Sequence, residues 1–401
     1  MKDKRYDGYR PYAYLEAGSD YRVFDLAPDG AGRVPDHRPP LDAAGEARAM
    51  RVLRDSLVLS LHDHPIRLPA DVPEVHDLRR HGRDFLAYEG LSRSGLDVVF
   101  DGMANGEATI TSRMAWKWDD IVYDLGMRLA DIAHQKMVYI ARDLESLEAA
   151  RTNGRIALVL TEEAATPIEN ELDRLDILYG LGVRMIGITY VETNTLGSGQ
   201  WEAHDGGLSH FGRAAVRRMN QLGMAIDIAH SGDRTSRDTI EASDRPVFVS
   251  HAGARAVWPT PRMKPDEELR ALAEKGGVIG IEAAPHSTQS PDRAPHALDA
   301  VMAHFEHCVE VMGIDHVAFG PDTLYGDHVA MHHAFAHLPP GRPAGRVGPT
   351  FEPVPYVAGI ENPTEAFPNI VRWLVGHGYA DEDIAKVLGE NVVRALGRIW
   401  A

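Results

Sequence analysis

Four histidines follow apolar segments that have the composition of buried strands. His62 and His64 come after the first such segment, His230 after a second and His251 after a third. Neutral imidazole is the commonest metal ligand in proteins. A single histidine in this place would usually do no more than end a strand, but the repeated placement favours a site at one end of a parallel sheet. The three segments are residues 56–61, 224–229 and 246–250.

The spacing of the first two histidines brings both to one face of their strand. Side chains alternate along a strand, so His62 and His64 point the same way and a cation could be held by both. Asp63 lies between them in the sequence and would face away. We therefore expect Asp63 to be a structural carboxylate rather than a ligand.

Carboxylates follow two further strands. Glu162 and Glu163 come directly after the apolar residues 156–160, and Asp322 comes after residues 316–319. An acidic pair just past a buried strand is either exposed or paired with cations. Beside the histidines, one of these glutamates is a candidate to bridge two metal ions. Asp322 is a candidate ligand, or a general base toward a metal-bound water.

The donors of this set are nitrogen and oxygen, without thiolate. They suit zinc, with manganese, iron or cobalt as alternatives. Two such ions, about 3.5–4 Å apart, would polarise a carbonyl group and lower the pKa of a bridging water toward about 7. Arg262, beyond His251 in the chain, has a guanidinium that can bind a carboxylate bidentately, although a solvated loop arginine has the same sequence context.

Apolar runs of strand character recur along the chain and alternate with amphipathic stretches. This alternation indicates a parallel sheet buried on both faces. Eight such runs predict an α/β fold, a (β/α)8 TIM-type barrel, with a doubly wound sheet as the alternative. The runs are residues 56–61, 96–100, 156–160, 185–189, 224–229, 247–250, 277–281 and 316–319. The expected helical stretches include residues 118–150, 168–181, 211–222, 233–242 and 266–275.

Three kinds of segment lie outside these units. Residues 1–45, rich in Tyr, Asp, Pro and Gly, predict an irregular N-terminal arm, which leaves residues 46–401 as one barrel domain. Two long loops, residues 192–210 and 323–356, would lie over the C-terminal face and cover the site. We expect the histidines of the second loop to be solvated; they are His328, His332, His333 and His337. Residues 364–378 and 381–399 predict two closing helices.

Composition excludes several classes of protein. The formal net charge of −17 argues against nucleic acid or an anionic membrane as a partner, because both require a basic patch. The single cysteine, Cys308, excludes an intramolecular disulfide framework and cysteine-rich zinc sites, and its helical context indicates a packed thiol. No signal-peptide core and no run of eighteen apolar residues occurs, so we expect a cytoplasmic protein.

Motifs spread over most of the chain carry a resemblance to a known family. They include GRIALVLTEEA, LDILYGLGVRMIGITY, LGMAIDIAHSG, RPVFVSHAGARAVWPTPR, GGVIGI, VAFGPD and YVAGIENPTEAFPN. From about Leu57 onward the chain resembles the membrane (renal-type) dipeptidases, peptidase family M19, within the amidohydrolase-like metal-dependent barrels. The resemblance implies a barrel, two divalent metal ions, a small-molecule substrate and a homodimer.

The resemblance also implies roles for individual residues. His62 matches the first metal ligand of the family's H-x-D motif, and His230 and His251 match the ligands of the second metal. Glu163 matches the bridging glutamate, because it lies nine residues after Gly154, as in the family pattern. By the same comparison, Arg262 would bind the substrate's carboxylate and Asp322 would handle the proton.

Two residues depart from the family pattern. His64 stands where the family has aspartate, which keeps a ligand but removes one negative charge from the site. Tyr190 stands where the family has a histidine that contacts the substrate. A tyrosine there could still donate a hydrogen bond to a developing oxyanion.

The expected activity is metal-dependent hydrolysis of an amide bond in a small carboxylate-bearing substrate such as a dipeptide, by a metal-activated water. One alternative is a divergent branch that acts on a non-peptide amide, a lactone or a specialised metabolite, because His64 and Tyr190 alter the site. Another is a relative without catalytic activity that serves as a binding or structural partner.

Overall fold

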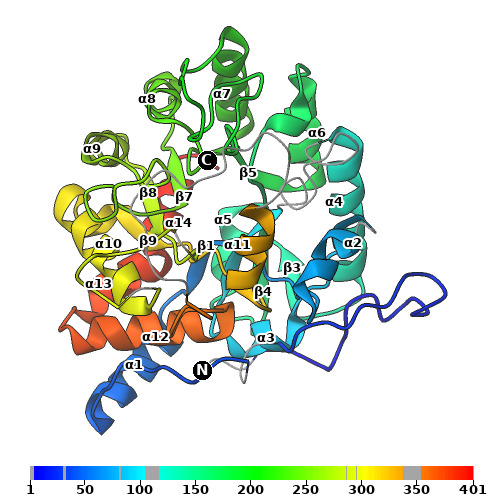
Figure 1. Ribbon diagram of the computed structural model, residues 1–401, viewed down its shortest axis with the longest axis vertical. Coiled ribbons are helices and arrows are strands. Elements are labelled where there is room, and N and C mark those ends of the chain that lie inside the picture. The colour runs from blue at the N-terminus through cyan, green and yellow to red at the C-terminus, as the bar shows by residue number, and fades with distance from the viewer. Residues whose placement is uncertain are drawn as a thin grey trace.

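The strands of the molecule form one parallel sheet that curves into a barrel (Figure 1). The computed structural model describes residues 4–29, 33–80, 83–103, 117–285, 287–294, 296–336 and 354–400. Within these residues the strand order is β1-β2-β4-β5-β6-β7-β8-β9, with β3 beside β4. The strands are β1 Leu59–Asp63, β2 Val98–Met103, β3 Val138–Ile140, β4 Ile156–Glu162, β5 Val183–Gly187, β6 Ala225–Asp227, β7 Phe248–Ala252, β8 Val278–Ile281 and β9 Val317–Phe319.

Backbone hydrogen bonds close the ring between its first strand and the segment after its last. The N–H of Asp322 donates to the carbonyl of His62 at 3.0 Å, and the N–H of His64 donates to the carbonyl of Thr323 at 2.9 Å. This closure confirms the predicted barrel, and the doubly wound alternative is wrong. Closure also brings the carboxyl ends of the strands to one end of the molecule, where barrel enzymes carry their sites.

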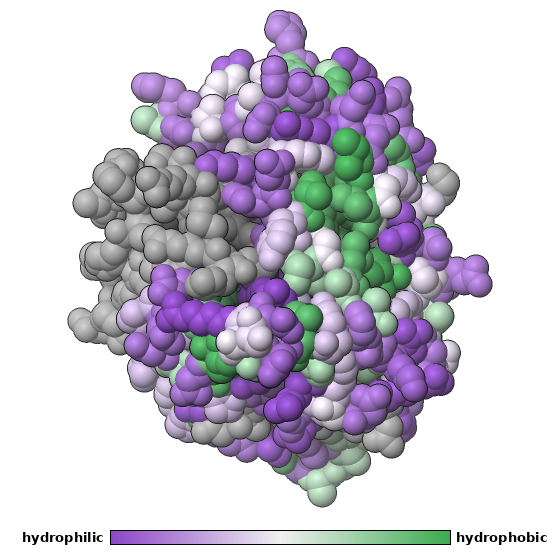
Figure 2. Space-filling view, turned by 90° about the vertical axis from the view of Figure 1, so that its right-hand side faces the viewer, coloured by the Kyte–Doolittle hydropathy of each residue, from purple (hydrophilic) through white to green (hydrophobic). Residues whose placement is uncertain are grey.

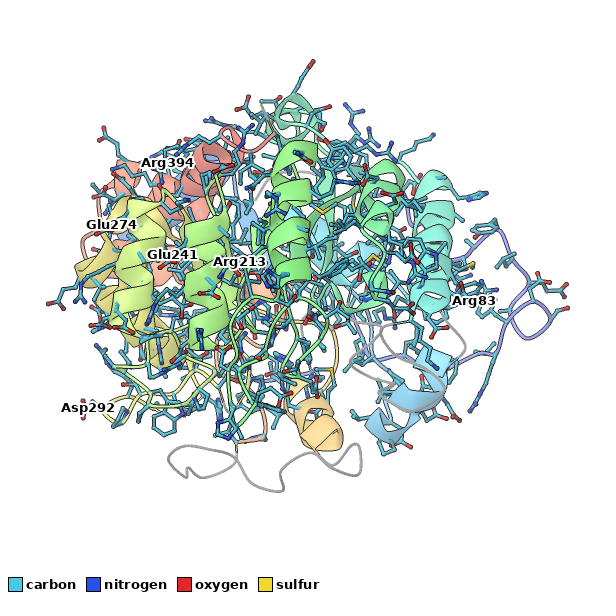
Figure 3. The ribbon with its side chains drawn as sticks, turned by 90° about the horizontal axis from the view of Figure 1, so that it is seen from above. Arg83, Arg213, Glu241, Glu274, Asp292 and Arg394 are labelled. Atoms are coloured by element: carbon cyan, nitrogen blue, oxygen red, sulfur yellow. The ribbon has the colours of Figure 1, made fainter. Side chains whose placement is uncertain are left out.

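Helices surround the strands on the outside of the barrel (Figure 1). Figure 3 shows α7, α8 and α9 standing side by side, with Arg213, Glu241 and Glu274 on this outer ring. The helices are α1 Ala43–Asp55, α2 Val75–Arg80, α3 Tyr88–Arg93, α4 Trp118–Ala133, α5 Leu144–Ala149, α6 Asp173–Leu181, α7 His210–Leu222, α8 Asp233–Ala242, α9 Asp266–Glu274, α10 Leu298–Met312, α11 His328–Ala336, α12 Pro363–Gly376, α13 Asp381–Ala385 and α14 Asn391–Leu396.

Local sequence accounts for the ends of the outer helices. The side chain of Ser209 accepts a hydrogen bond from the N–H of Gly212 and so caps the start of α7. Gly223 ends the same helix with φ +73°, a conformation that glycine adopts without strain. These signals fix where α7 begins and where it turns back toward β6.

The apolar residues of the strands form two layers. One cluster consists of side chains from one face of the strands together with side chains of α14. It includes Leu59, Phe100, Val159 and Phe248. The other packs the opposite strand faces against the surrounding helices and includes Cys308 of α10. Cys308 is fully buried, and burial raises the pKa of its thiol. The prediction of a packed thiol is confirmed.

In its described residues, 4–29 and 33–42, the N-terminal arm is irregular, and α1 begins at Ala43. The hydroxyl of Tyr9 and the N–H of Tyr12 both donate to Asp131 of α4, at 2.8 and 2.7 Å. Tyr88 donates to the other carboxylate oxygen at 2.8 Å. A buried carboxylate with three donors is well satisfied, so Asp131 fastens the arm to the barrel.

Three of the predicted elements were wrong in part. Residues 118–150 form not one helical stretch but α4, β3 and α5. Residues 381–399 are interrupted by a π-helical turn at Lys386–Glu390. The loop of residues 323–356 contains α11, and its residues 337–353 lie outside the described part of the chain.

The outer surface is largely hydrophilic. Figure 2 shows one face on which hydrophilic residues surround a patch of apolar ones. The large apolar residues most exposed in the described ranges are Tyr14, Val23, Tyr123, Ile177 and Trp201. None of the described helices is both long and apolar enough to cross a lipid bilayer.

Candidate metal centre

The residues predicted to bind metal meet at the carboxyl ends of the barrel strands. His62 lies on β1 and His251 on β7, while Glu163 and His230 follow β4 and β6, and His64 comes just after β1. All five side chains are buried. One donor atom each from His62, Glu163 and His251 lie within 4.8 Å of one another. The structure therefore brings together residues that are up to 189 positions apart, from His62 to His251.

Irregular strand pairing accompanies three of these placements. The register of β1 on β2 shifts between Ser60 and Asp63, and that of β7 on β8 shifts between Val249 and Ala252. A third shift separates Leu160 from its neighbour on β4. Such irregularities re-aim side chains and are common beside active sites. Here they lie just at the points where the apolar strand residues give way to the candidate ligands.

The first histidine pair faces two carboxylates. The Nε2 atom of His62 lies 3.3 Å from Glu163 Oε1 and 3.5 Å from Asp322 Oδ1. The Nε2 atom of His64 lies 3.2 Å and 3.0 Å from the same two oxygens. The Nδ1 atom of His64 is 2.6 Å from the carbonyl oxygen of Gly102, which orients the ring with Nε2 toward the centre. Such a carbonyl contact is typical of metal-binding histidines.

The second histidine pair is formed by His230 and His251. Their Nε2 atoms are 2.9 Å apart, a separation that fits two ligands of one cation with metal–nitrogen distances of about 2.0–2.1 Å. The Nδ1 atom of His251 lies 2.7 Å from the hydroxyl of Ser250, which in turn donates to Asp227 at 2.6 Å. A carboxylate that holds a histidine through a hydroxyl fixes the ring for metal binding.

Glu163 stands between the two pairs. Its Oε1 atom faces His62 and His64, and its Oε2 atom lies 3.8 Å from Nε2 of His230. Oε1 of Glu163 and Nε2 of His62 are buried atoms for which the described part of the chain supplies no hydrogen-bond partner. Buried polar atoms are rarely left unpaired, so these two atoms, with the nitrogen and oxygen donors around them, fit divalent cations.

The two pairs differ in their electrostatic surroundings. Burial lowers the pKa of His62 and of His64, but the carboxylates of Asp322 and Glu163 outweigh burial, and the pKa of His64 rises to about 9. For His230 and His251, burial is the largest cause and the pKa of each lies well below its ordinary value. The first pair is thus surrounded by a negative field that favours positive charge, and the second pair holds the neutral imidazoles that metals bind.

Asp322 and Asp63 have separate functions. Asp322 follows β9 with φ +59°, in the left-handed region where Asp and Asn are tolerated, and so turns its carboxylate toward His62 and His64. The carboxylate of Asp63 accepts hydrogen bonds from the N–H and the hydroxyl of Thr323, at 2.7 and 2.8 Å. The prediction that Asp63 is structural is confirmed.

Tyr190 borders the second pair. It lies just after β5 and is 7% exposed. Its ring centroid is 4.3 Å from that of His230. Gln200, from the loop of residues 192–210, lies 3.4 Å from Nδ1 of His230. This loop therefore reaches the site, as expected.

Arg262 contacts the backbone of His251 in the second pair. It also forms an ion pair with Glu282, a residue that the sequence analysis did not identify. Its guanidinium donates to the carbonyl oxygens of His251 at 2.7 Å and Ala229 at 2.9 Å, and forms an ion pair with Glu282. Glu282 directly follows β8, is fully buried and lies within 4.8 Å of His251 and Asp322 by its donor atoms. Its place at a strand end was the signal that could have identified it.

Glu162, the alternative to Glu163, lies away from the histidine pairs. As the last residue of β4 it pairs with Met103 of β2, and among the described residues neither of its buried oxygens has a hydrogen-bond partner. Burial, then Asp124 and Glu163, raises its pKa well above the ordinary value. The contacts to the two histidine pairs that the structure shows belong to Glu163 and not to Glu162, so Glu163 remains the candidate bridging carboxylate.

The expectation that the loop histidines are solvated was wrong for His328. This residue begins α11 and is fully buried, with its Nε2 atom 3.1 Å from Nε2 of His332. His337 and the side chain of His333 lie outside the described residues.

Comparison with known proteins assigns the family. A model of the membrane dipeptidases, peptidase family M19, matches residues 48–333. The chain belongs to the membrane dipeptidase family M19. The match includes every candidate ligand as well as Arg262 and Asp322.

Curated M19 relatives are similar over part of their length. Dipeptidase tcpJ of Claviceps purpurea is 28% identical over 281 residues, which make up 69% of this chain and 58% of tcpJ. Dipeptidase aclJ of Aspergillus oryzae is 29% identical over 248 residues, 61% of this chain and 52% of aclJ. The chain thus spans little more than half the length of these two relatives.

Solved structures share the barrel. An amidohydrolase from Pseudomonas aeruginosa superposes with a TM-score of 0.70 at 25% identity, covering 88% of this chain and 99% of that one. A metallo peptidase from Rhodobacter sphaeroides, bound to a phosphinate mimic of the dipeptide L-Ala-D-Ala, gives 0.66 at 20% identity, covering 86% and 100%. These neighbours confirm the fold of an M19 barrel.

Proposed function

We propose that this M19 protein is a metal-dependent hydrolase that cleaves the amide bond of a small substrate such as a dipeptide. The observation that carries the proposal is the position of Glu163, whose two carboxylate oxygens face separate histidine pairs. Such a bridging carboxylate is what a pair of metal ions requires. The names of the curated relatives, which are dipeptidases, support the choice of bond.

The residues divide between holding the cations and handling the substrate. His62, His64 and Asp322 would hold one cation, His230 and His251 the other, and Glu163 would contact both. The donor set suits zinc. When bound, two such cations lower the pKa of a water and polarise the substrate carbonyl.

Asp322 is positioned to move the proton. Its Oδ1 atom lies at the first histidine pair, and its side chain is 13% exposed. We assign to it the acceptance of a proton from the attacking water and its transfer to the leaving amine nitrogen. Tyr190, against His230, would direct its hydroxyl toward the oxyanion that develops on the carbonyl.

The test is metal content followed by activity on the same sample. Protein purified without added metal is analysed for bound ions and then assayed with a panel of dipeptides, before and after chelation and with zinc restored. We expect bound metal, turnover, and loss of turnover on chelation. The His251→Ala variant should lose metal at one site. His316→Ala is the control and should keep its metal, because His316 lies just before β9 and its ring contacts the carbonyl of Gly277.

Two results would count against the proposal. Unchanged metal content in the His251→Ala variant would remove this histidine from the ligand set. Bound metal without turnover of any dipeptide, together with turnover of a lactone or a non-peptide amide, would identify the protein as a hydrolase of that other substrate class.

A further inference from the structure

The positive charge of Arg262 is matched by a carboxylate of the protein itself. Its guanidinium forms an ion pair with Glu282 and donates to the carbonyls of His251 and Ala229. These contacts use three of the five N–H donors of a guanidinium. Within the described residues, two donors are left for a substrate, but the charge is already neutralised.

Glu282 is fixed in this position from several sides. Its second carboxylate oxygen accepts a hydrogen bond from the hydroxyl of Thr288 at 3.2 Å, and its backbone N–H donates to the carbonyl of Ala252 at 3.0 Å. The residue is fully buried. Separating the pair would leave an uncompensated charge in the protein interior, which is strongly unfavourable. Breaking the pair to admit another anion beside Arg262 is therefore unfavourable.

The ion pair lies at the border of the metal centre. Donor atoms of Glu282, His251 and Asp322 lie within 4.8 Å of one another, and Arg262 is bonded to the backbone of His251. A substrate whose scissile carbonyl lies between the histidine pairs would lie near these residues. Glu282 is therefore one of the charges that such a substrate meets.

The ion pair between Arg262 and Glu282 affects which substrate group is accepted there. A free carboxylate beside Arg262 would be the second anion for one guanidinium, and it would lie next to the fixed carboxylate of Glu282. Like charges brought together at a binding site weaken binding. An uncharged acceptor, such as the carbonyl of a carboxamide or an ester, can use the remaining N–H donors without that repulsion.

We propose that Glu282 is a specificity-determining residue that makes the site select substrates with an uncharged carboxamide or ester group beside Arg262, in preference to a free carboxylate. The scissile amide bond in this inference rests on the proposed function. The inference changes the expectation drawn from the sequence, in which Arg262 binds a substrate carboxylate directly.

The test measures binding rather than turnover. Two phosphinate mimics of one dipeptide, identical except for a C-terminal carboxylate or carboxamide, are titrated by calorimetry at pH 8 into the zinc-loaded protein. The variants are Glu282→Gln, which removes the charge, and Glu282→Asp, which keeps it. Glu268→Gln is the matched control, because Glu268 is also a buried acid, paired with Lys264 at 3.1 Å, and is not among the converging donors.

We expect the unsubstituted protein to bind the carboxamide at least about tenfold more tightly than the carboxylate. The Glu282→Gln variant should lose or reverse this preference, because the charge of Arg262 then becomes available to an anion. The Glu282→Asp and Glu268→Gln variants should keep it. Metal content should be equal in all four proteins.

Any of three binding results would overturn the inference: tighter binding of the carboxylate by the unsubstituted protein, an unchanged preference in Glu282→Gln, or no binding of either mimic. Loss of metal in Glu282→Gln would instead make Glu282 a ligand and would overturn it too. The expected binding pattern without cleavage of dipeptide amides would refute the proposed function alone. Cleavage with no effect of Glu282→Gln on selectivity would refute this inference alone.

Discussion

The imidazole rings of His62 and His251 stack face to face, with centroids 3.7 Å apart and planes 18° apart. The two residues come from β1 and β7, which are not neighbours in the strand order. Contact between them requires that the sheet be closed. The metal centre is therefore a product of barrel closure, and partial unfolding that opens the barrel between β7 and β1 should release metal before the helices melt.

Replacing Asp322 by asparagine tests its proposed handling of the proton. Asparagine tolerates the φ of +59° found at this position, so the backbone should keep its shape. Because the carboxylate is lost, we expect kcat to fall by about 10²- to 10⁴-fold, with little change in melting temperature. Steady-state kinetics on samples of known metal content provide the measurement. A kcat within threefold of the unsubstituted protein would show that another group moves the proton.

Gly102 of β2 leaves the space that the first histidine pair occupies. A Cβ atom built there would lie 2.5 Å from Cε1 and 2.8 Å from Nε2 of His62. We therefore expect Gly102→Ala to displace the ring and to lower metal occupancy, while far-ultraviolet circular dichroism stays unchanged. Gly126→Ala is the control, since a Cβ on Gly126 of α4 has no neighbour within 4 Å and alanine should stabilise the helix by about 0.5–1 kcal/mol. Equal metal content in the two variants would contradict the assignment.

Ser250 connects His251 to the carboxylate of Asp227. Removing the hydroxyl leaves the Nδ1 atom of His251 without this partner, and such losses typically weaken metal binding by about 10- to 100-fold. We expect that range for Ser250→Ala in a competition titration with a chelator. Ser243→Ala removes a buried hydroxyl bonded to Asn220 at 3.1 Å and should leave metal affinity unchanged. An equal effect of the two substitutions would indicate general loosening of the fold.

His304 of α10 should make stability depend on pH. Its Nδ1 atom accepts from the N–H of Ala254 at 2.9 Å, and its Nε2 atom lies 2.6 Å from the carbonyl of Gln289, so the ring is held neutral. Burial lowers its pKa to about 4, against about 6.5 in the unfolded chain. The unfolded state then binds more protons between these values, and stability falls as the pH drops from about 6.5 to 4, by up to about 3 kcal/mol.

The corresponding measurement compares denaturant unfolding at pH 7 and pH 5. His304→Gln can still donate and accept a hydrogen bond but cannot take up a proton, so its loss of stability between the two pH values should be smaller than that of the unsubstituted protein. Identical losses would assign the acid sensitivity to other groups.

The sequence predicted the barrel strands well because their patterns are strong. The eight apolar runs correspond to the eight strands of the ring, with ends displaced by a few residues. The missed strand, β3, is three residues long, is only partly buried and pairs with β4 alone. Its residues lie within a stretch of helical periodicity, which concealed so short a strand.

The candidate ligands were predictable for a similar reason, since each follows an apolar run. Glu282 also follows an apolar run, but it was overlooked because a single acid after β8 resembles loop charge until its contact with Arg262 is known. His328 was missed because the Gly- and Pro-rich surroundings of α11 suggested a loop. The ion pair of Glu282 and the burial of His328 are tertiary contacts that no local pattern encodes.

Because Cys308 is buried, the reactivity of its thiol reports local opening of the fold. It is the only cysteine of the chain, and it packs in the cluster between the strands and the helices. A thiol reagent can reach it only after α10 separates from that cluster, so the rate of labelling measures how often this part of the fold opens. Labelling at fixed reagent concentration, with metal present and after chelation, would show how far cations at the strand ends hold the distant helix layer closed.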